Sequence, residues 1–177
     1  SKSDRLDVLG SLELDGVEVE TYPTAIHFQD LHGKVHLQRS KDFDISFKGL
    51  RGRMDQARIE VDGTINHIGS KSMLLDGRVK ADGLRLAELV SVLPILKPYQ
   101  PDGQIDVDAK VRYQFDKPEK LHTAGKIKAR DLAMHYEQYH LVQGDVDMSL
   151  AGQTAIIEQA SIQLNDQTLH IRGEVAG

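Results

Sequence analysis

The stretch DGQIDVD, from Asp102 to Asp108, has the spacing of acids in this sequence that comes nearest to a calcium-binding loop. Carboxylate oxygens at alternate positions suit Ca²⁺, but such loops close with a glutamate. Here the acids alternate with Ile105 and Val107, and no glutamate stands at the closing distance. This alternation is typical of a β-strand with one wet face. We therefore expect a solvated strand face and no calcium site.

The eight histidines are the other candidate metal ligands. His32 and His36 would share one strand face, but Lys34 would point the same way between them. A lysine between two imidazoles disfavours a metal ion, and the pattern places no carboxylate beside the pair. We expect no metal site.

Motifs for catalysis are missing from the sequence. It has no cysteine, which excludes thiol nucleophiles, cysteine-ligated zinc and disulfides. It also has no glycine-rich phosphate loop, no Gly-x-Ser-x-Gly elbow and no His-Glu pair at helical spacing. Paired acids such as Asp106 and Asp108 fall on a polar strand face, which offers no pocket for acid–base catalysis. We expect neither enzyme activity nor a cofactor.

Charge and hydropathy limit the class of partner. The 22 lysines and arginines are spread among 27 acidic residues, for a net charge of −5, so no nucleic-acid partner is expected. No stretch approaches the roughly 18 to 20 apolar residues of a membrane-spanning helix, and the start, SKSDRLDV, lacks the apolar run of a signal peptide. Because the chain starts without Met and ends on EVAG after a strand-like run, we expect a fragment of a longer protein.

A short phrase occurs three times and indicates how the strands are built. GRVKADGL at 77–84, GKIKARDL at 125–132 and GSLELDGV at 10–17 each shift their apolar residues from one parity to the other near the Asp-Gly or Arg-Asp pair. Side chains alternate between the two faces of a strand, so the apolar set stays on one face only if a residue is inserted. We expect a β-bulge or tight turn at each copy, with Gly or Asp at positive φ.

Period-two alternation covers nearly the whole chain. From Ile105 to Phe115, for example, every second residue is apolar and the residues between them are polar or charged. We count roughly a dozen such strands, separated by turn-forming pairs. The pattern predicts a mainly β fold, an elongated curved sheet, antiparallel or mixed, folded as a taco or groove.

A longer repeat lies above the short phrase. Gly33 and Gly63 are 30 residues apart, and Gly144 and Gly173, in similar strand contexts, are 29 apart. We therefore expect residues 1–177 to be a single domain with two internal repeat units, at roughly 10–83 and 103–177.

One segment, LRLAELVSVLPIL, has helical spacing instead. Its leucines and valines fall at i, i+3, i+4 and i+7, which predicts a short amphipathic helix near 84–96. Asp82 is a candidate N-terminal cap, and Pro94 and Pro98 would end the helix. A helix that plugs an open end of the sheet is the simplest interpretation, and one that touches a membrane or gates a groove is the alternative.

The apolar strand positions predict an aliphatic inner surface, either filled by its own side chains or open as a groove. An open groove would hold an acyl chain by burying methylene groups, at about 0.8 kcal/mol each, without directional contacts. The candidate lipid-binding positions are Val35, Leu37, Ile45, Phe47, Ile59, Val61, Ile105, Val107, Val111, Ile127, Met148, Ile162, Leu164, Leu169 and Ile171.

The order of motifs resembles the AsmA-like family of Gram-negative envelope proteins. The resemblance rests on GRVKADGL, the helix ending in Leu-Pro, then PDGQIDV, and the glycine-centred strands near Gly33, Gly144 and Gly173. It implies a β-taco segment of a periplasmic protein that is anchored in the inner membrane. Members of this family are implicated in moving phospholipids towards the outer membrane, and some in assembling outer-membrane proteins. No catalytic residue is implied, and only the apolar groove positions carry over.

Three functions are compatible with this pattern. The leading hypothesis is a groove that binds the acyl chains of phospholipid or another lipid. The second is a scaffold that assists outer-membrane assembly proteins through exposed strand edges. The third is a passive spacer with a filled interior.

Overall fold

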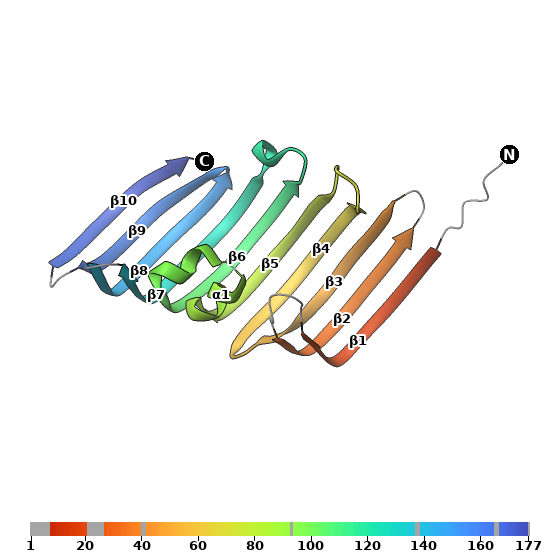
Figure 1. Cartoon of the computed structure of the whole chain (residues 1–177), viewed down its shortest axis with the longest axis horizontal. Helices are drawn as coiled ribbons and strands as arrows, with labels where there is room; N and C mark the ends of the chain where they lie inside the picture. The colour runs from red at the N-terminus through yellow and green to blue at the C-terminus, as the bar shows by residue number, and fades with distance from the viewer. Residues whose placement is uncertain are drawn as a thin grey trace.

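The computed structural model describes residues 8–20, 27–39, 42–92, 94–136, 139–164 and 167–176, which form one ten-stranded sheet (Figure 1). The strands lie side by side in sequence order, and all neighbouring pairs are antiparallel. Each strand begins beside the end of the preceding one, so short connections suffice.

The strands are 10 to 15 residues long. They are β1 (Val8–Glu20), β2 (His27–Arg39), β3 (Phe43–Met54), β4 (Ala57–Ile68), β5 (Leu74–Arg85), β6 (Asp102–Gln114), β7 (His122–Tyr136), β8 (Tyr139–Gly152), β9 (Thr154–Leu164) and β10 (Gln167–Ala176). Helix α1 (Leu86–Val92) and the 3₁₀ helix η1 (Pro94–Tyr99) connect β5 to β6, and the 3₁₀ turn η2 (Pro118–Lys120) precedes β7.

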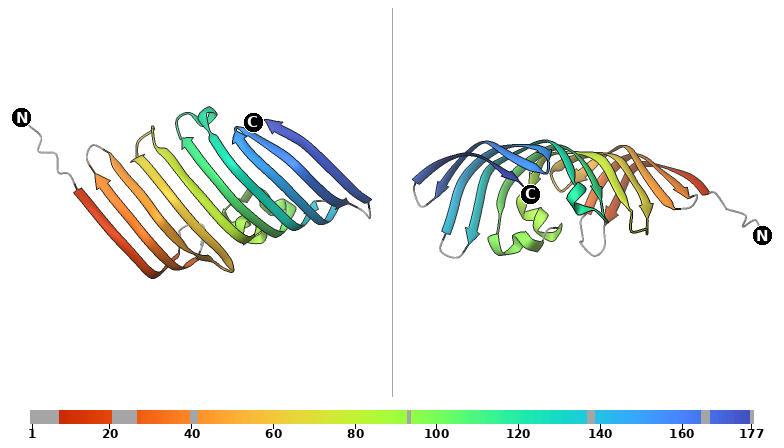
Figure 2. Two further views of the ribbon diagram at one scale, coloured as in Figure 1. Left: turned by 180° about the vertical axis from the view of Figure 1, so that it is seen from behind. Right: turned by 90° about the horizontal axis from the view of Figure 1, so that it is seen from above.

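The predicted class, a mainly β fold with one curved sheet and one short α-helix, is confirmed. The sheet is antiparallel throughout, and its described strands number ten where the sequence suggested about a dozen. The count is lower because strands continue through their phase changes instead of ending there. Figure 2 shows an open arch in which β1 and β10 lie at opposite edges and α1 lies on the concave side.

The predicted bulges are present in all three copies of the short phrase. The register shifts in β1, β5 and β7, and Gly16, Gly83 and Asp131 have φ of 65°, 71° and 51° there. A fourth bulge, in β3 at Gly49 with φ of 58°, was not predicted. Glycine reaches this left-handed region without a steric penalty, and Asp tolerates it better than most residues. Each of the four bulges keeps the apolar side chains on one face while the strand turns.

A carboxylate on the next strand holds three of these bulges. The bulge amide donates a hydrogen bond to an aspartate Oδ1, which satisfies an N–H group that the sheet ladder leaves unpaired. These bonds run from Gly49 to Asp62, from Gly83 to Asp106 and from Asp131 to Asp145, with N···O distances of 2.6, 2.8 and 3.2 Å.

The role of Asp106 corrects a prediction. The sequence suggested a merely solvated carboxylate on a wet strand face. In the structure, Asp106 accepts the Gly83 N–H and also pairs with Arg130. Its neighbour Asp108 fits the original interpretation, because it is exposed and pairs only with the exposed Arg78.

The helix is shorter than predicted, and its ends differ. Asp82 does not cap it, because β5 continues through the bulge and pairs with β6 as far as Arg85. Pro94 opens η1 and Pro98 lies inside it, so the chain continues as a 3₁₀ helix to Tyr99. Proline has a φ that fits helical geometry, so a new helical segment begins with it.

The small core lies where α1 meets the sheet. Buried Met54, Ala57, Ala81 and Leu84 form a cluster, and Leu89 of α1 packs against it. The face that carries these residues is therefore the concave, apolar face. Two of the four side chains are alanines, which lets the helix approach the strands closely.

Removing the bulge carboxylates should destabilise the sheet. We expect Asp62→Ala or Asp106→Ala to lower the free energy of unfolding by about 1 to 2 kcal/mol, because each leaves a bulge N–H without its charged acceptor. Asp106→Asn should lose less, since its amide oxygen still accepts the bond. Urea denaturation measures both, with Asp108→Ala as the control that changes little. Equal losses for Asp106→Ala and Asp108→Ala would contradict the capping role.

Candidate functional site

The apolar face of the sheet is the candidate site, and strand register shows which side chains share it. Residues directly opposite each other in an antiparallel pair point to the same face. One unbroken row crosses six strands, each member opposite the next: Ile59, Ala81, Val107, Ile127, Met148 and Ile157.

The remaining predicted positions extend this face in both directions. Their partners also belong to the apolar set or are small, so the face is continuous from β2 to β10. The pairs are Val35 with Phe47, Leu37 with Ile45, Val61 with Val79, Ile105 with Ala129, Val111 with Gly77, Ile162 with Leu169, and Ile171 with Ala160. Leu164 pairs with Gln167 through the backbone, and its side chain lies outside the described part.

Most side chains on this face are only half-buried. Among the described residues none of the large side chains is fully buried, and five of the eight buried apolar residues are alanines. Leu169 and Ile171, near the β10 edge, are 41% and 40% exposed. Since, among the residues that the structure describes, no second layer covers the face away from α1, these exposures favour an open groove over an interior filled by its own side chains.

Small residues line the middle of the face. Gly63 lies opposite Gly77, and Ala109 lies opposite Gly125. A Cβ atom on Gly125 would come within 2.2 Å of the Asp108 carbonyl oxygen, so only glycine fits. These residues and the buried alanines were not among the predicted site positions, although their parity matches that of the predicted positions. They alternate with larger side chains across the strands, because Val79 lies opposite Ala109 and Gly77 opposite Val111.

Helix α1 packs on the apolar face over β5 and β6. Beside the packed Leu89, Glu88 faces the β3–β4 turn. Burial, a hydrogen bond with Asp55 and the Asp55 charge raise the pKa of Glu88 to about 7, and only Arg85 acts in the opposite direction. The ionisation of one carboxyl is therefore coupled to the docking of the helix on the apolar face.

The opposite, convex face is held by cross-strand ion pairs. Arg78 binds both oxygens of the Asp108 carboxylate, at 2.8 and 2.7 Å, and this bond lowers the pKa of Asp108. Longer ion pairs join Arg112 to Asp76, at 3.8 Å, and Lys128 to Asp147, at 4.0 Å. Such exposed pairs add little to stability. They do fix which strand positions face each other.

The environment of His32 differs from the prediction. Its imidazole lies between two carboxylates, with Nδ1 2.9 Å from Asp15 and Nε2 3.0 Å from Asp30. The sequence pattern hid this contact because Asp30 sits at positive φ in a bulge, which turns its side chain towards His32. The described residues contain no group of three or more side chains arranged to hold a metal ion.

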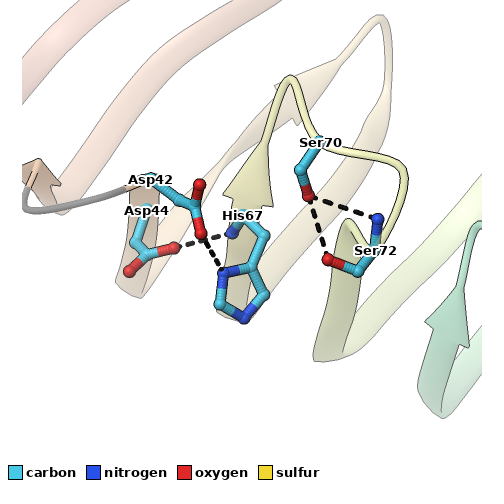
Figure 3. Close-up of polar contacts among 5 residues, drawn as sticks. All are labelled: Asp42, Asp44, His67, Ser70 and Ser72. Carbon is cyan, nitrogen blue, oxygen red and sulfur yellow. Dashed lines mark hydrogen bonds and ion pairs between the residues drawn. The ribbon is translucent and has the colours of Figure 1, made fainter.

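A second polar cluster orders the ends of β3 and β4 (Figure 3). The His67 ring points towards Asp42, with Nδ1 3.0 Å from the carboxylate, and the His67 N–H donates to Asp44 at 2.7 Å. Ser70 and Ser72 bond to each other in the following turn, at 3.1 Å, away from the imidazole. These contacts stabilise an irregularity of β4, where the register against β3 shifts and His67 has φ of 57°.

Comparison with family models, with characterised proteins and with solved structures found no match for this chain. In the described ranges, no helix is both long enough and apolar enough to cross a membrane.

The docking of α1 should depend on pH. Folding raises the pKa of Glu88 from 4.5 to about 7, so the folded state keeps a proton that the unfolded state releases. Stability from this group is complete below pH 4.5 and falls as the pH rises to about 7. Urea midpoints at pH 5 and pH 8 should differ more for the wild type than for Glu88→Gln. Parallel pH profiles for the two proteins would contradict the coupling.

Proposed function

We propose that this chain is a hydrophobic-groove segment that binds phospholipid acyl chains on its concave face and supports lipid transport between the inner and outer membranes. Following the AsmA-like resemblance of its sequence, we further propose that it acts in the periplasm, as part of a protein anchored in the inner membrane.

The observation that carries this proposal is an aliphatic face that is continuous across the strands and yet half-exposed. Each methylene group buried against it contributes about 0.8 kcal/mol, and the contact needs no fixed hydrogen bond. Large exposed apolar areas on proteins usually bind another apolar surface. Because the described face offers aliphatic side chains and no buried charge, a hydrocarbon chain is the ligand that suits it chemically.

The size of the face supports movement of a bound chain. A bilayer core of about 30 Å holds two leaflets, so one acyl chain extends about 15 Å. With neighbouring strands about 4.8 Å apart, ten strands span about 43 Å. An acyl chain lying across the strands would therefore cover only a third of the face. It could shift along the face while staying in apolar contact.

The second candidate is a scaffold for outer-membrane assembly proteins. The observation that favours it is β10, an edge strand of the described sheet whose residues are all exposed. A client strand could add to such an edge through backbone hydrogen bonds. A passive spacer, the third candidate, predicts neither ligand.

Substitutions at the open end of the face should separate lipid binding from folding. Leu169 and Ile171 are already about 40% exposed, so Leu169→Asp and Ile171→Asp should fold and yet repel an acyl chain. His170, exposed between them on the other face, provides the matched control His170→Asp. Val107 packs against the buried cluster, so Val107→Asp would test folding and binding together.

Native mass spectrometry of the purified chain, followed by lipid extraction, measures the outcome. We expect phospholipid on the wild type and on His170→Asp, and less of it on Leu169→Asp, where the β10 end of the face is closed to an acyl chain. Lipid-free wild-type protein after gentle purification would count against the groove. In that case, amide shifts confined to β10 on adding a client peptide would support the scaffold instead.

A further inference from the structure

A shallow basic depression lies on the convex face, away from the apolar groove. It has a volume of about 410 Å³ and is formed over β2, β3, β4 and β5, with His32 among its lining residues. Alternation along the strands places its charged side chains opposite in direction to Ile59 and Ala81. We call it the arginine depression. The cations that line it are Arg51, Arg53, Arg58 and Lys80, and the acids are Asp30, Glu60 and Asp82.

The arginines of this depression lack the ion pairs that several cations of the neighbouring strands form. From β5 to β8, Arg78, Arg112, Lys128 and Arg130 each form an ion pair with an aspartate on an adjacent strand. Within the part of the chain that the structure describes, Arg51, Arg53 and Arg58 form none, and all three are exposed.

Strand register sets two of these arginines against each other. Arg53 lies directly opposite Arg58 in the β3–β4 ladder. Like charges at directly opposite positions repel and destabilise the pair. Asp82 lies directly opposite Arg58 and Glu60 directly opposite Arg51, but neither acid lies between Arg53 and Arg58, and Asp30 is bound to His32. An anion between Arg53 and Arg58 would remove the repulsion.

We propose that the arginine depression binds a phosphate group, with Arg53 and Arg58 as its principal ligands and Arg51 beside them. A guanidinium group presents donors in a planar fork that matches two phosphate oxygens, and such charged hydrogen bonds are stronger than neutral ones. The phosphate belongs either to a small soluble compound or to a lipid headgroup at a membrane surface. The site is on the opposite face from the apolar groove and does not depend on acyl-chain binding.

Two titrations distinguish the sources of phosphate. In the first, inorganic phosphate replaces chloride at constant ionic strength, and the arginine Nε–H signals are followed by NMR. In the second, the chain is sedimented with phosphatidylcholine vesicles that contain or lack phosphatidylglycerol. Arg53→Gln and Arg58→Gln should each weaken binding about tenfold, the effect of losing one charged hydrogen-bonding group. The matched control is Arg112→Gln, on the same face but already paired with Asp76.

Each outcome bears on the proposal. Binding of inorganic phosphate alone identifies a soluble ligand, and binding only to vesicles with phosphatidylglycerol identifies a headgroup. The proposal is overturned if neither binds, or if Arg112→Gln weakens binding as much as Arg53→Gln. Folding is checked by thermal melting, where Arg53→Gln should melt no lower than the wild type because one repelling charge is gone, and Arg58→Gln, which lies opposite both Arg53 and Asp82, should stay folded. If they unfold, the wild-type spectra still decide, since the signals of Arg53 and Arg58 must be among those that move.

Discussion

The bond between a bulge amide and a carboxylate on the next strand is the contact on which the shape of this protein depends. An antiparallel strand presents its side chains to alternating faces, so a slip of one residue would turn the whole apolar set to solvent. Each bulge inserts the residue that corrects the phase, and Asp62, Asp106 and Asp145 hold the inserted amides in place. These four bulges lie on alternate strands from β1 to β7, and β2 carries a further bulge at Asp30.

The consequence is a sheet that bends without closing. Bulges increase local twist and curvature, which makes the apolar face the inside of an arch (Figure 2). A second sheet would usually cover such a face, but here the only helical cover among the described residues is α1 with η1, over a few central strands. The half-exposed aliphatic surface therefore has two causes. The bulges keep the apolar side chains on one face, and in the described residues no second layer packs against most of that face.

Much of this could be predicted from the sequence, because alternation and bulge positions are local properties. GRVKADGL and GKIKARDL contain both the phase change and the residues that tolerate positive φ. The bulge at Gly49 was missed because FKGL has no preceding acid to mark it. The role of Asp106 was missed for another reason: its partner Gly83 is 23 residues away, and only the strand register brings them together. The start of α1 could not be predicted for the same reason. Pairing with β6 keeps Arg85 in β5, so the helix begins only at Leu86.

The two faces of the sheet would select a ligand by different interactions. On the concave face, affinity would follow buried area, which any sufficiently long aliphatic ligand supplies, so selectivity for one lipid cannot arise from the strands alone. On the convex face, paired charges satisfy one another and leave little for a ligand. Arg53 and Arg58 are like charges at directly opposite positions, with Asp82 on the other side of Arg58. Any geometric selectivity of the proposed phosphate site would therefore come from these strands.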